Sequence, residues 1–179
     1  DPVAGPGQIV VETVAASING ADAKVCAGEY PGQPRFPLSL GRDFSGVVAT
    51  LGDGVSDLRV GDEVFGVLET GRDGTYVEKL AIGAAIVAKK PETLTHVEAT
   101  ALALIGLTAL CTIENALKLQ KGETILIQGG AGGVASFAIQ LAKHLGASVG
   151  TTTSTANVEL VRGLGADEVI DYKKQPFED

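Results

Sequence analysis

The 179-residue sequence has no methionine, no tryptophan and only two cysteines and two histidines. Cys26 and Cys111 lie far apart and form no CxxC pair, so the sequence indicates neither a disulfide framework nor a redox motif. The absence of methionine, with Asp1 as first residue, leads us to expect a fragment of a longer protein. No basic region and apolar run of a secretory signal stands at the start, and we expect a cytoplasmic protein.

Positive charge is also scarce. Lysine and arginine total 14 against 22 aspartates and glutamates, which gives a formal net charge of -8. Nucleic-acid binding requires a positive surface, so we expect no nucleic-acid partner. Backbone amides at a helix N-terminus could still hold a small anion. The longest apolar stretch, residues 99–113, is short for a membrane span, and we predict a buried helix and no membrane partner.

The first half of the chain is rich in short apolar segments separated by turns. Four segments predict strands: residues 8–15, 44–51, the second part of 60–67, and 75–80. Prolines and glycines predict a loop over 30–37 and a turn over 71–74. This spacing indicates a small β-barrel-type domain over residues 1–95.

The second half changes character. Thr95 and Glu98 have the spacing of a capping box, and helical sequence follows to about Leu119. Residues 124–128 are nearly all apolar, which is typical of a central parallel strand buried on both faces. Further strands are predicted at 148–152 and 168–172, with helices before each of them. This β-α-β-α-β order predicts one half of a doubly wound parallel sheet over residues 96–179, whose second half we expect to be missing.

A glycine-rich turn joins the first of these strands to its helix. Gly130, Gly132 and Ala135 match the G-x-G-x-x-G/A pattern. Gly130 permits the tight turn, Gly132 lets the backbone approach a pyrophosphate, and Ala135 lets the helix pack close to the strand. Gly133 and Val134 open the helix, where unpaired amides and the helix dipole favour phosphate. We interpret the turn as a dinucleotide-binding site, with a ligand-free glycine loop as the alternative.

The residues after the second strand of this sheet bear on which dinucleotide binds. Enzymes that use NAD carry an acidic residue about 20 residues after the glycines, whereas residues 150–155 contain no Asp or Glu. The hydroxyls of Thr153 and Ser154 can donate hydrogen bonds to a 2′-phosphate, so we predict NADPH as cofactor. Alternatively, these hydroxyls only cap the next helix, and no Lys or Arg lies in this stretch.

Several segments together resemble the medium-chain dehydrogenase/reductase superfamily, in its zinc-free, quinone oxidoreductase-like branch. Besides the glycine turn they are residues 17–22, 41–46, 60–66, 74–78, 106–109 and 164–172. The resemblance covers essentially the whole chain. It implies an α/β plus β fold, with an incomplete GroES-like catalytic domain over 1–95 and a C-terminally incomplete Rossmann domain over 96–179. It also implies an active site between the domains and a complete protein that is a homodimer.

Zinc-dependent relatives hold a catalytic metal at positions that this sequence fills differently. Asn19 stands where their first cysteine would be, and Arg42 stands where a histidine would be. Neither an amide nor a guanidinium is a usable Zn²⁺ ligand, so we expect no metal site. His96 and His144 fall in predicted helices away from these motifs, and we interpret both as surface or packing residues.

The resemblance also suggests site residues. Asn19 would lie near the nicotinamide and substrate, where its amide could bind a carbonyl oxygen; alternatively, it only caps a loop. Thr108 would lie near the nicotinamide, or only bond its own helix backbone. Tyr30 would stack on a flat acceptor, or only pack its loop. Tyr172 would border the adenosine 2′-phosphate, or only pack at a strand end.

Two further charged residues adjoin one of these segments. Arg42 and Asp43 could form an ion pair that lines the active site, or an ordinary structural pair.

The resulting hypothesis is an NADPH-dependent oxidoreductase that transfers hydride to a small-molecule quinone or α,β-unsaturated carbonyl without zinc. One alternative is an enoyl reductase module of a fatty-acid or polyketide synthase. Another is a non-catalytic NADPH-binding scaffold, because a fold does not prove activity. We expect the isolated chain to be inactive and poorly stable, since its half-sheet would expose an unpaired edge.

Overall fold

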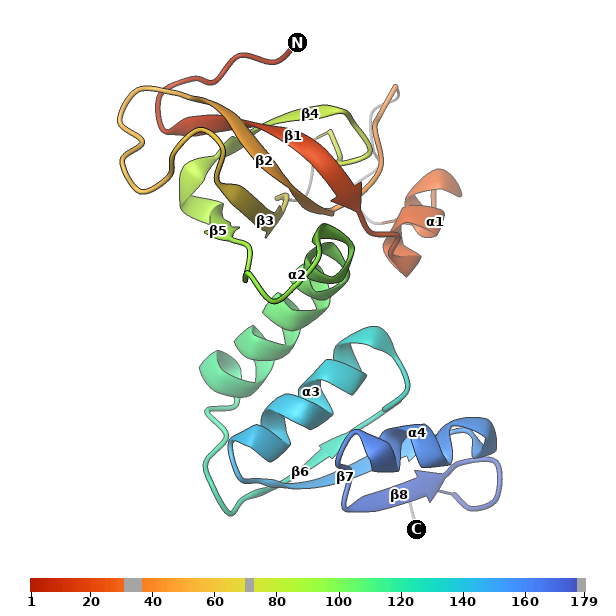
Figure 1. The fold of residues 1–179 in the computed structure, drawn as a ribbon. Helices are drawn as coiled ribbons and strands as arrows, with labels where there is room; N and C mark the ends of the chain where they lie inside the picture. Colours follow the sequence, from red (N-terminus) through yellow and green to blue (C-terminus); the bar gives the residue numbers. More distant parts are fainter. Residues whose placement is uncertain (31–36, 70–72, 177–179) are drawn as a thin grey trace. The chain divides into compact units, whose positions relative to one another are not determined.

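The computed structural model describes residues 1–30, 37–69 and 73–176, and it comprises two compact units, Asp1–Leu104 and Ile105–Asp179 (Figure 1). Most of the predicted loop over 30–37 and the start of the predicted turn over 71–74 lie outside the described residues. The assignment of a catalytic domain to residues 1–95 and a cofactor domain to 96–179 stays a prediction.

The first unit is built on an antiparallel sheet of five strands in the order β4-β1-β2-β3-β5. Its strands are β1 (Gln8–Ala16), β2 (Asp43–Leu51), β3 (Glu63–Val67), β4 (Lys79–Gly83) and β5 (Val87–Lys89). A short helix, α1 (Gly20–Cys26), follows β1, and a 3₁₀ turn, η1 (Ala84–Ile86), joins β4 to β5. Three of the four predicted strands are therefore confirmed, and β5 was missed because it has only three residues, one of them a lysine.

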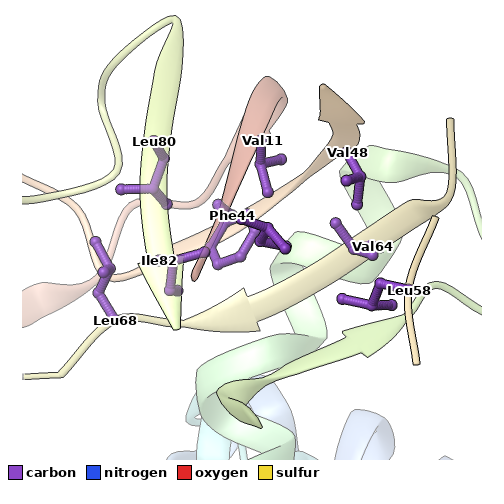
Figure 2. Close-up of a cluster of buried hydrophobic side chains, with 9 residues drawn as sticks. Val11, Phe44, Val48, Leu58, Val64, Leu68, Leu80 and Ile82 are labelled. Carbon is purple, nitrogen blue, oxygen red and sulfur yellow. The ribbon is translucent and has the colours of Figure 1, made fainter. Parts of the chain in front are cut away.

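One face of this sheet carries the hydrophobic core. Phe44 is fully buried at its centre, among side chains from β1, β3 and β4 such as Val11, Val64 and Ile82 (Figure 2). These residues share a face because successive strand residues point to opposite sides. Each such side chain contributes about 1.5–3 kcal/mol when it is removed from water.

The bounds of the strand predicted at 75–80 are wrong. β4 begins only at Lys79. Thr75 and Tyr76 instead bond to the chain before β2, with Tyr76 N donating to Leu40 O at 2.9 Å and Thr75 N to Gly41 O at 3.3 Å. Thr75 and Tyr76, although typical of strands, therefore lie in the loop before β4 and bond to the segment before β2.

The long helix after the sheet begins as predicted. Thr95 N donates to Glu98 Oε2 at 2.8 Å, and Glu98 N donates to Thr95 Oγ1 at 3.2 Å, so the capping box is formed. Helix α2 (His96–Leu110) continues into a π-helical segment, η2 (Cys111–Ala116).

This helix is more exposed than predicted. Residues 96–116 are long and apolar enough to cross a membrane, which is weak evidence because core helices of soluble proteins pass the same test. Only 33% of its most apolar window is buried in the described structure, and Leu107 is half exposed. The prediction of a buried helix over 99–113 therefore holds for only one side of it.

The second unit contains a parallel three-stranded sheet in the order β6-β7-β8. It comprises β6 (Thr124–Ile127), α3 (Gly133–His144), β7 (Ser148–Thr153), η3 (Thr155–Asn157), α4 (Val158–Gly163) and β8 (Glu168–Asp171). This confirms the predicted β-α-β-α-β order, and α3 and α4 lie on the same side of the sheet (Figure 1). Helix α3 stops before Gly146, whose φ of 84° permits the turn into β7.

Strand β6 is not buried on both faces as predicted. Ile125 and Ile127 pack into the core with α3, whereas Leu126, which points to the opposite face, is 52% exposed. Among the described strands, β6 pairs only with β7. Its nearly all-apolar sequence indicates a strand of a parallel sheet but does not reveal which of its faces this chain covers.

Candidate functional site

The glycine-rich turn is held in place by strand β7. Gly129 N donates to Thr152 Oγ1 at 3.0 Å, and Gly130 N donates to Thr152 O at 2.9 Å. Gly132 N then closes the turn by donating to Gly129 O at 2.8 Å. The turn thus has a defined shape, anchored by one threonine of the neighbouring strand.

The individual glycines have different physical reasons to be glycine. A Cβ on Gly130 would lie 2.3 Å from Thr151 Oγ1, so no larger residue fits there without a shift. A Cβ on Gly132 would meet only Gly129 O, at 3.2 Å, which leaves the space in front of α3 open. The left-handed φ of 68° falls on Gly129, so the turn itself requires glycine there, whereas Gly130 is required by its packing against Thr151. The roles of Gly130 and Gly132 in dinucleotide binding stay predictions.

The first turn of α3 offers free backbone donors. Gly132 is the N-cap residue and has no side chain to cap the helix, so the amides of Gly133, Val134 and Ala135 have no intrahelical acceptor and no side-chain cap. The dipole of this 12-residue helix adds positive potential at the same point. A pyrophosphate needs such converging N–H donors and an open backbone approach, and these residues fit that group.

The residues predicted near an adenosine 2′-phosphate lie together at the carboxyl edge of the sheet. Tyr172 N donates to Thr153 O at 3.1 Å, and Ser154 follows Thr153 directly. Tyr172 is 48% exposed and Ser154 is half buried, whereas Thr153 is only 2% exposed. Ser154 and Tyr172 therefore present accessible polar groups at this edge more directly than Thr153 does.

The same edge carries a cation that sequence reasoning missed. Lys173 Nζ lies over the Tyr172 ring, 5.6 Å from its centroid. Residues 150–155, at the end of β7 and after it, contain no Lys or Arg, whereas Lys173 follows β8. Because β7 and β8 are parallel neighbours, their carboxyl ends meet, and this adjacency was the available signal.

Asp171 places a carboxylate close to this edge. It accepts a hydrogen bond from Thr155 Oγ1 at 2.7 Å and another from Lys173 N at 3.1 Å. The Thr155 hydrogen bond is the main reason that the pKa of Asp171 lies below its usual value, and Lys174 Nζ lies 3.6 Å away. The Asp171 carboxylate is therefore hydrogen-bonded and paired within its own segment of the chain.

In the first unit, Asn19 lies in a cluster of polar side chains between β1 and α1. Asn19 Nδ2 donates to Asp43 Oδ2 at 2.7 Å, and Ser17 Oγ donates to the same oxygen. Asn19 is the N-cap residue of α1 and shares a capping box with Asp22, whose Oδ2 accepts a hydrogen bond from Asn19 N at 2.8 Å. The side chain is therefore held by Asp43 as well as by the start of helix α1.

The predicted Arg42–Asp43 ion pair is wrong. Arg42 Nε donates to Leu68 O at 2.8 Å, and no salt bridge joins Arg42 to Asp43 within the described residues. The physical reason is that adjacent residues at the start of a strand point to opposite faces. Asp43 is 1% exposed and bonds to Asn19 and Ser17 instead.

Tyr30 and Thr108 are the other two residues predicted to be catalytic. Tyr30 is half buried at a bend after α1, next to residues outside the described part of the chain. Thr108 is exposed on α2, and its carbonyl accepts a hydrogen bond from Thr112 Oγ1 at 2.8 Å. Asn19 and Tyr30 belong to the first unit, and Thr108 and the glycine turn belong to the second. The structure brings Asn19 together with Asp43, and the glycine turn with β7.

His96 packs against one of the sequence motifs and not away from them as predicted. Ser45 Oγ donates to Val64 O at 2.9 Å, so the 2.8 Å contact between Ser45 Oγ and His96 Nδ1 is donated by the imidazole. His96 Nε2 lies 3.4 Å from Glu63 Oε1. His96 is therefore a packing residue that links α2 to β2 and β3.

No group of three or more His, Cys, Asp or Glu side chains in residues 1–30, 37–69 and 73–176 could hold a metal ion.

Similarity to known proteins identifies the family of the chain. Residues 5–145 match the alcohol dehydrogenase GroES-like domain. The chain belongs to the medium-chain dehydrogenase/reductase superfamily. Its similarity is to the quinone oxidoreductase-like branch, as the sequence predicted.

Three similar proteins support this assignment. A 2-methylene-furan-3-one reductase of Solanum lycopersicum is 42% identical over 181 residues, which cover 96% of this chain and 46% of that protein. An NADPH-dependent alkenal/one oxidoreductase of Arabidopsis thaliana is 40% identical over 184 residues, which cover 96% and 47%. The solved structure of the quinone oxidoreductase from Coxiella burnetii is 35% identical, with a TM-score of 0.91 over 99% of this chain and 57% of that one.

Membership of the superfamily confirms the predicted fold class, a GroES-like domain followed by part of a Rossmann domain. The chain spans about half the length of the curated relatives that it matches. In the superfamily context, the glycine turn and the Asn19 cluster are the two parts of the chain on which a functional proposal can rest.

Proposed function

We propose that the complete protein is an NADPH-dependent, zinc-independent oxidoreductase that reduces an α,β-unsaturated carbonyl or a quinone. The observation that carries the proposal is the uncapped N-terminus of α3 behind Gly132, in a chain of this superfamily. When bound, NADPH supplies the hydride, and the protein orients the reactants and excludes side reactions. In an enone, hydride adds to the β-carbon and a proton completes the reduction.

The residues of the second unit would bind the cofactor. The amides of Gly133, Val134 and Ala135 would donate to the pyrophosphate, and Gly130 and Gly132 would let it approach.

Residues at the carboxyl edge of the sheet would distinguish NADPH from NADH. Ser154 and Tyr172, with Thr153 behind them, would line the 2′-phosphate site, and Lys173 would supply a positive charge there. Asp171, which precedes Tyr172, lies 3.6 Å from Lys174 Nζ, whose positive charge would offset part of the repulsion between Asp171 and the phosphate. The name of the Arabidopsis thaliana relative, which includes NADPH, agrees with this preference.

Residues of the first unit, with Thr108, would face the reacting groups. Asn19 would bind near the nicotinamide and substrate, and Tyr30 would stack on a flat acceptor. The donor chemistry supports zinc independence: Asn19 directs its amide nitrogen to Asp43, and the Arg42 guanidinium donates to Leu68 O. A cytoplasmic location and a homodimeric complete protein stay predictions from the sequence.

The experiment that tests this function uses the complete protein after dialysis against a chelator. We expect NADPH oxidation with α,β-unsaturated ketones or quinones, tighter binding of NADPH than of NADH, and no dependence on added zinc. Lys173→Ala should weaken NADPH binding and leave NADH binding unchanged. Lys121→Ala, which removes an exposed lysine before β6, at the amino end of the same sheet, is the matched control.

Three outcomes would contradict the proposal. Tighter NADH binding would refute the cofactor preference, and one tightly bound zinc per chain would refute zinc independence. NADPH binding without turnover of any enone or quinone would favour a non-catalytic scaffold. Turnover confined to acyl thioesters would favour the enoyl reductase alternative.

A further inference from the structure

We propose that Thr152 is a positioning residue for the cofactor: its side chain holds the glycine turn in the shape that binds the pyrophosphate. Thr152 belongs to β7 and lies outside the G-x-G-x-x-G/A pattern. This inference rests on the proposed function, because it assumes that a nicotinamide dinucleotide binds at the turn. It deepens that function by naming a buried residue that sets the affinity for the cofactor through the turn.

The backbone of the turn does not hold its shape by itself. Residues 129–133 are all glycine except Ala131, and glycine loses more conformational freedom on ordering than any other residue. A hydrogen bond from Gly132 N to Gly129 O at 2.8 Å closes the turn, but it does not fix the turn relative to the sheet. Contacts from outside the turn must therefore select one arrangement.

Thr152 accepts hydrogen bonds from two consecutive amides of the turn. Its Oγ1 accepts from Gly129 N at 3.0 Å, and its carbonyl oxygen accepts from Gly130 N at 2.9 Å. The second bond needs only the backbone of β7, whereas the first depends on the side chain. Gly129 is also the residue at which the turn takes a left-handed φ of 68°, so the hydroxyl oxygen holds the turn where its backbone changes direction.

The surroundings of Thr152 make its hydroxyl oxygen a rigid acceptor. Thr152 is 6% exposed in a parallel sheet, an environment in which valine is common and brings no polar group to satisfy. Strand β7 lies between β6 and β8, and Thr152 is paired with Ile170 of β8, so its backbone is held in place. The side chain can therefore transmit the order of the sheet to the turn.

Preorganisation links this hydrogen bond to affinity. A site that is competent for binding only part of the time binds its ligand more weakly, in proportion to the competent fraction. The amides of Gly133 and Val134 at the start of α3 converge on the pyrophosphate only while the turn leads into the helix in this shape. The net value of one hydrogen bond corresponds to a change in affinity of about 3- to 10-fold.

The test measures dissociation constants of the complete protein and its variants by fluorescence titration. Thr152→Val keeps the shape of the side chain, removes the acceptor and should weaken NADPH and NADH binding equally, by about 3- to 10-fold, because both cofactors carry the same pyrophosphate. Thr152→Ser restores the oxygen and should bring both constants to within about twofold of the unmodified protein. Adenosine 2′-monophosphate, which has no pyrophosphate, should bind Thr152→Val as tightly as the unmodified protein.

Two controls separate this role from a general loss of structure. Thr95→Ala removes a side-chain hydrogen bond to a backbone amide in the first unit, so it should lower stability and leave both cofactor dissociation constants unchanged. In the ligand-free, ¹⁵N-labelled complete protein, the Gly129 amide should exchange with solvent faster in Thr152→Val than in the unmodified protein. The amide of Ile139, buried within α3, should keep its protection in both.

Three results would overturn the inference. One is an unchanged NADPH affinity in Thr152→Val. The others are a loss that Thr152→Ser does not restore and an equal loss for adenosine 2′-monophosphate, since each would indicate a structural role alone.

Failure of the proposed function gives a different result. If NADPH binds without turnover of any substrate, the function fails, and a loss of affinity confined to the two cofactors still supports the role of Thr152. If NADH binds more tightly than NADPH, the cofactor preference fails, while Thr152→Val should still weaken both equally. If neither cofactor binds the unmodified protein, the function and the inference fail together.

Discussion

The two central glycines of the turn should fail in different ways when each is replaced by alanine. In Gly130→Ala, the new Cβ would lie 2.3 Å from Thr151 Oγ1 and 3.1 Å from Ile139 Cδ1. Thr151 cannot yield easily, because it is fully buried and its Oγ1 donates to Ile127 O at 2.6 Å. Overpacking of this kind costs about 1–3 kcal/mol, and loss of the threonine hydrogen bond adds about 1 kcal/mol.

Gly132→Ala should leave the fold nearly intact. Gly132 has φ −77° and ψ 158°, which alanine adopts without strain, and its nearest neighbour would be Gly129 O at 3.2 Å. An alanine N-cap costs at most about 1 kcal/mol relative to glycine. The added methyl group would nevertheless stand in the open approach to α3, so we expect NADPH affinity to fall at least about tenfold, or 1.4 kcal/mol.

The assay is urea denaturation of the complete protein and both variants, together with fluorescence titration of NADPH. We expect a lower unfolding midpoint for Gly130→Ala, and weaker cofactor binding at nearly unchanged stability for Gly132→Ala. Unchanged NADPH affinity in Gly132→Ala would refute the claim that the pyrophosphate approaches the chain here. Unchanged stability in Gly130→Ala would refute the packing argument.

Three further predictions concern stability. Thr95→Ala removes the side-chain cap of α2 and should lower the free energy of unfolding, measured by urea denaturation, by about 1 kcal/mol. An unchanged free energy would mean that this cap does not stabilise the protein. Asp171 has a pKa held below 3.8, chiefly by Thr155, so its contribution is present above that value and lost as the pH falls through the lowered pKa. Asp171→Asn should therefore flatten the loss of stability in acid, and an unchanged pH profile would contradict this. The isolated 179-residue chain should aggregate through the free β6 edge, and Leu126→Lys should reduce light scattering; a clean monomer with a sharp thermal transition would refute this.

Local sequence signals predicted much of the fold. The strands β1, β2, β6, β7 and β8 follow from runs of β-branched or apolar residues, and the α2 cap follows from the Thr95–Glu98 spacing. The glycine turn was predicted because strand, turn and helix signals agree within about 20 residues. These features depend on interactions between residues that are close in sequence.

The failures involve contacts between distant residues. The hydroxyl of Tyr76 bonds to Ser17 O and Asp22, which draws its segment away from the sheet and displaces the start of β4. The exposure of Leu126 depends on which elements cover the β6 sheet, and no local pattern contains that information.

The candidate site shows the same division. The cofactor turn is one continuous segment, and it could be interpreted from the sequence alone. The Asn19–Asp43 pair spans 24 residues, and Lys173 lies near the cofactor edge only because β8 lies beside β7. Neighbouring strand order was the signal for Lys173, whereas only the three-dimensional structure could show that Asp43 turns to Asn19 and not to Arg42.

The most direct test of the central claim follows the hydride. The complete protein, freed of metal by a chelator, is incubated with an α,β-unsaturated ketone and NADPH that carries deuterium at both positions on C4 of the nicotinamide, and the product is analysed by mass spectrometry and NMR. The proposed function predicts one deuterium at the β-carbon of the saturated ketone without added zinc. A product without deuterium, or turnover only after zinc is restored, would contradict it.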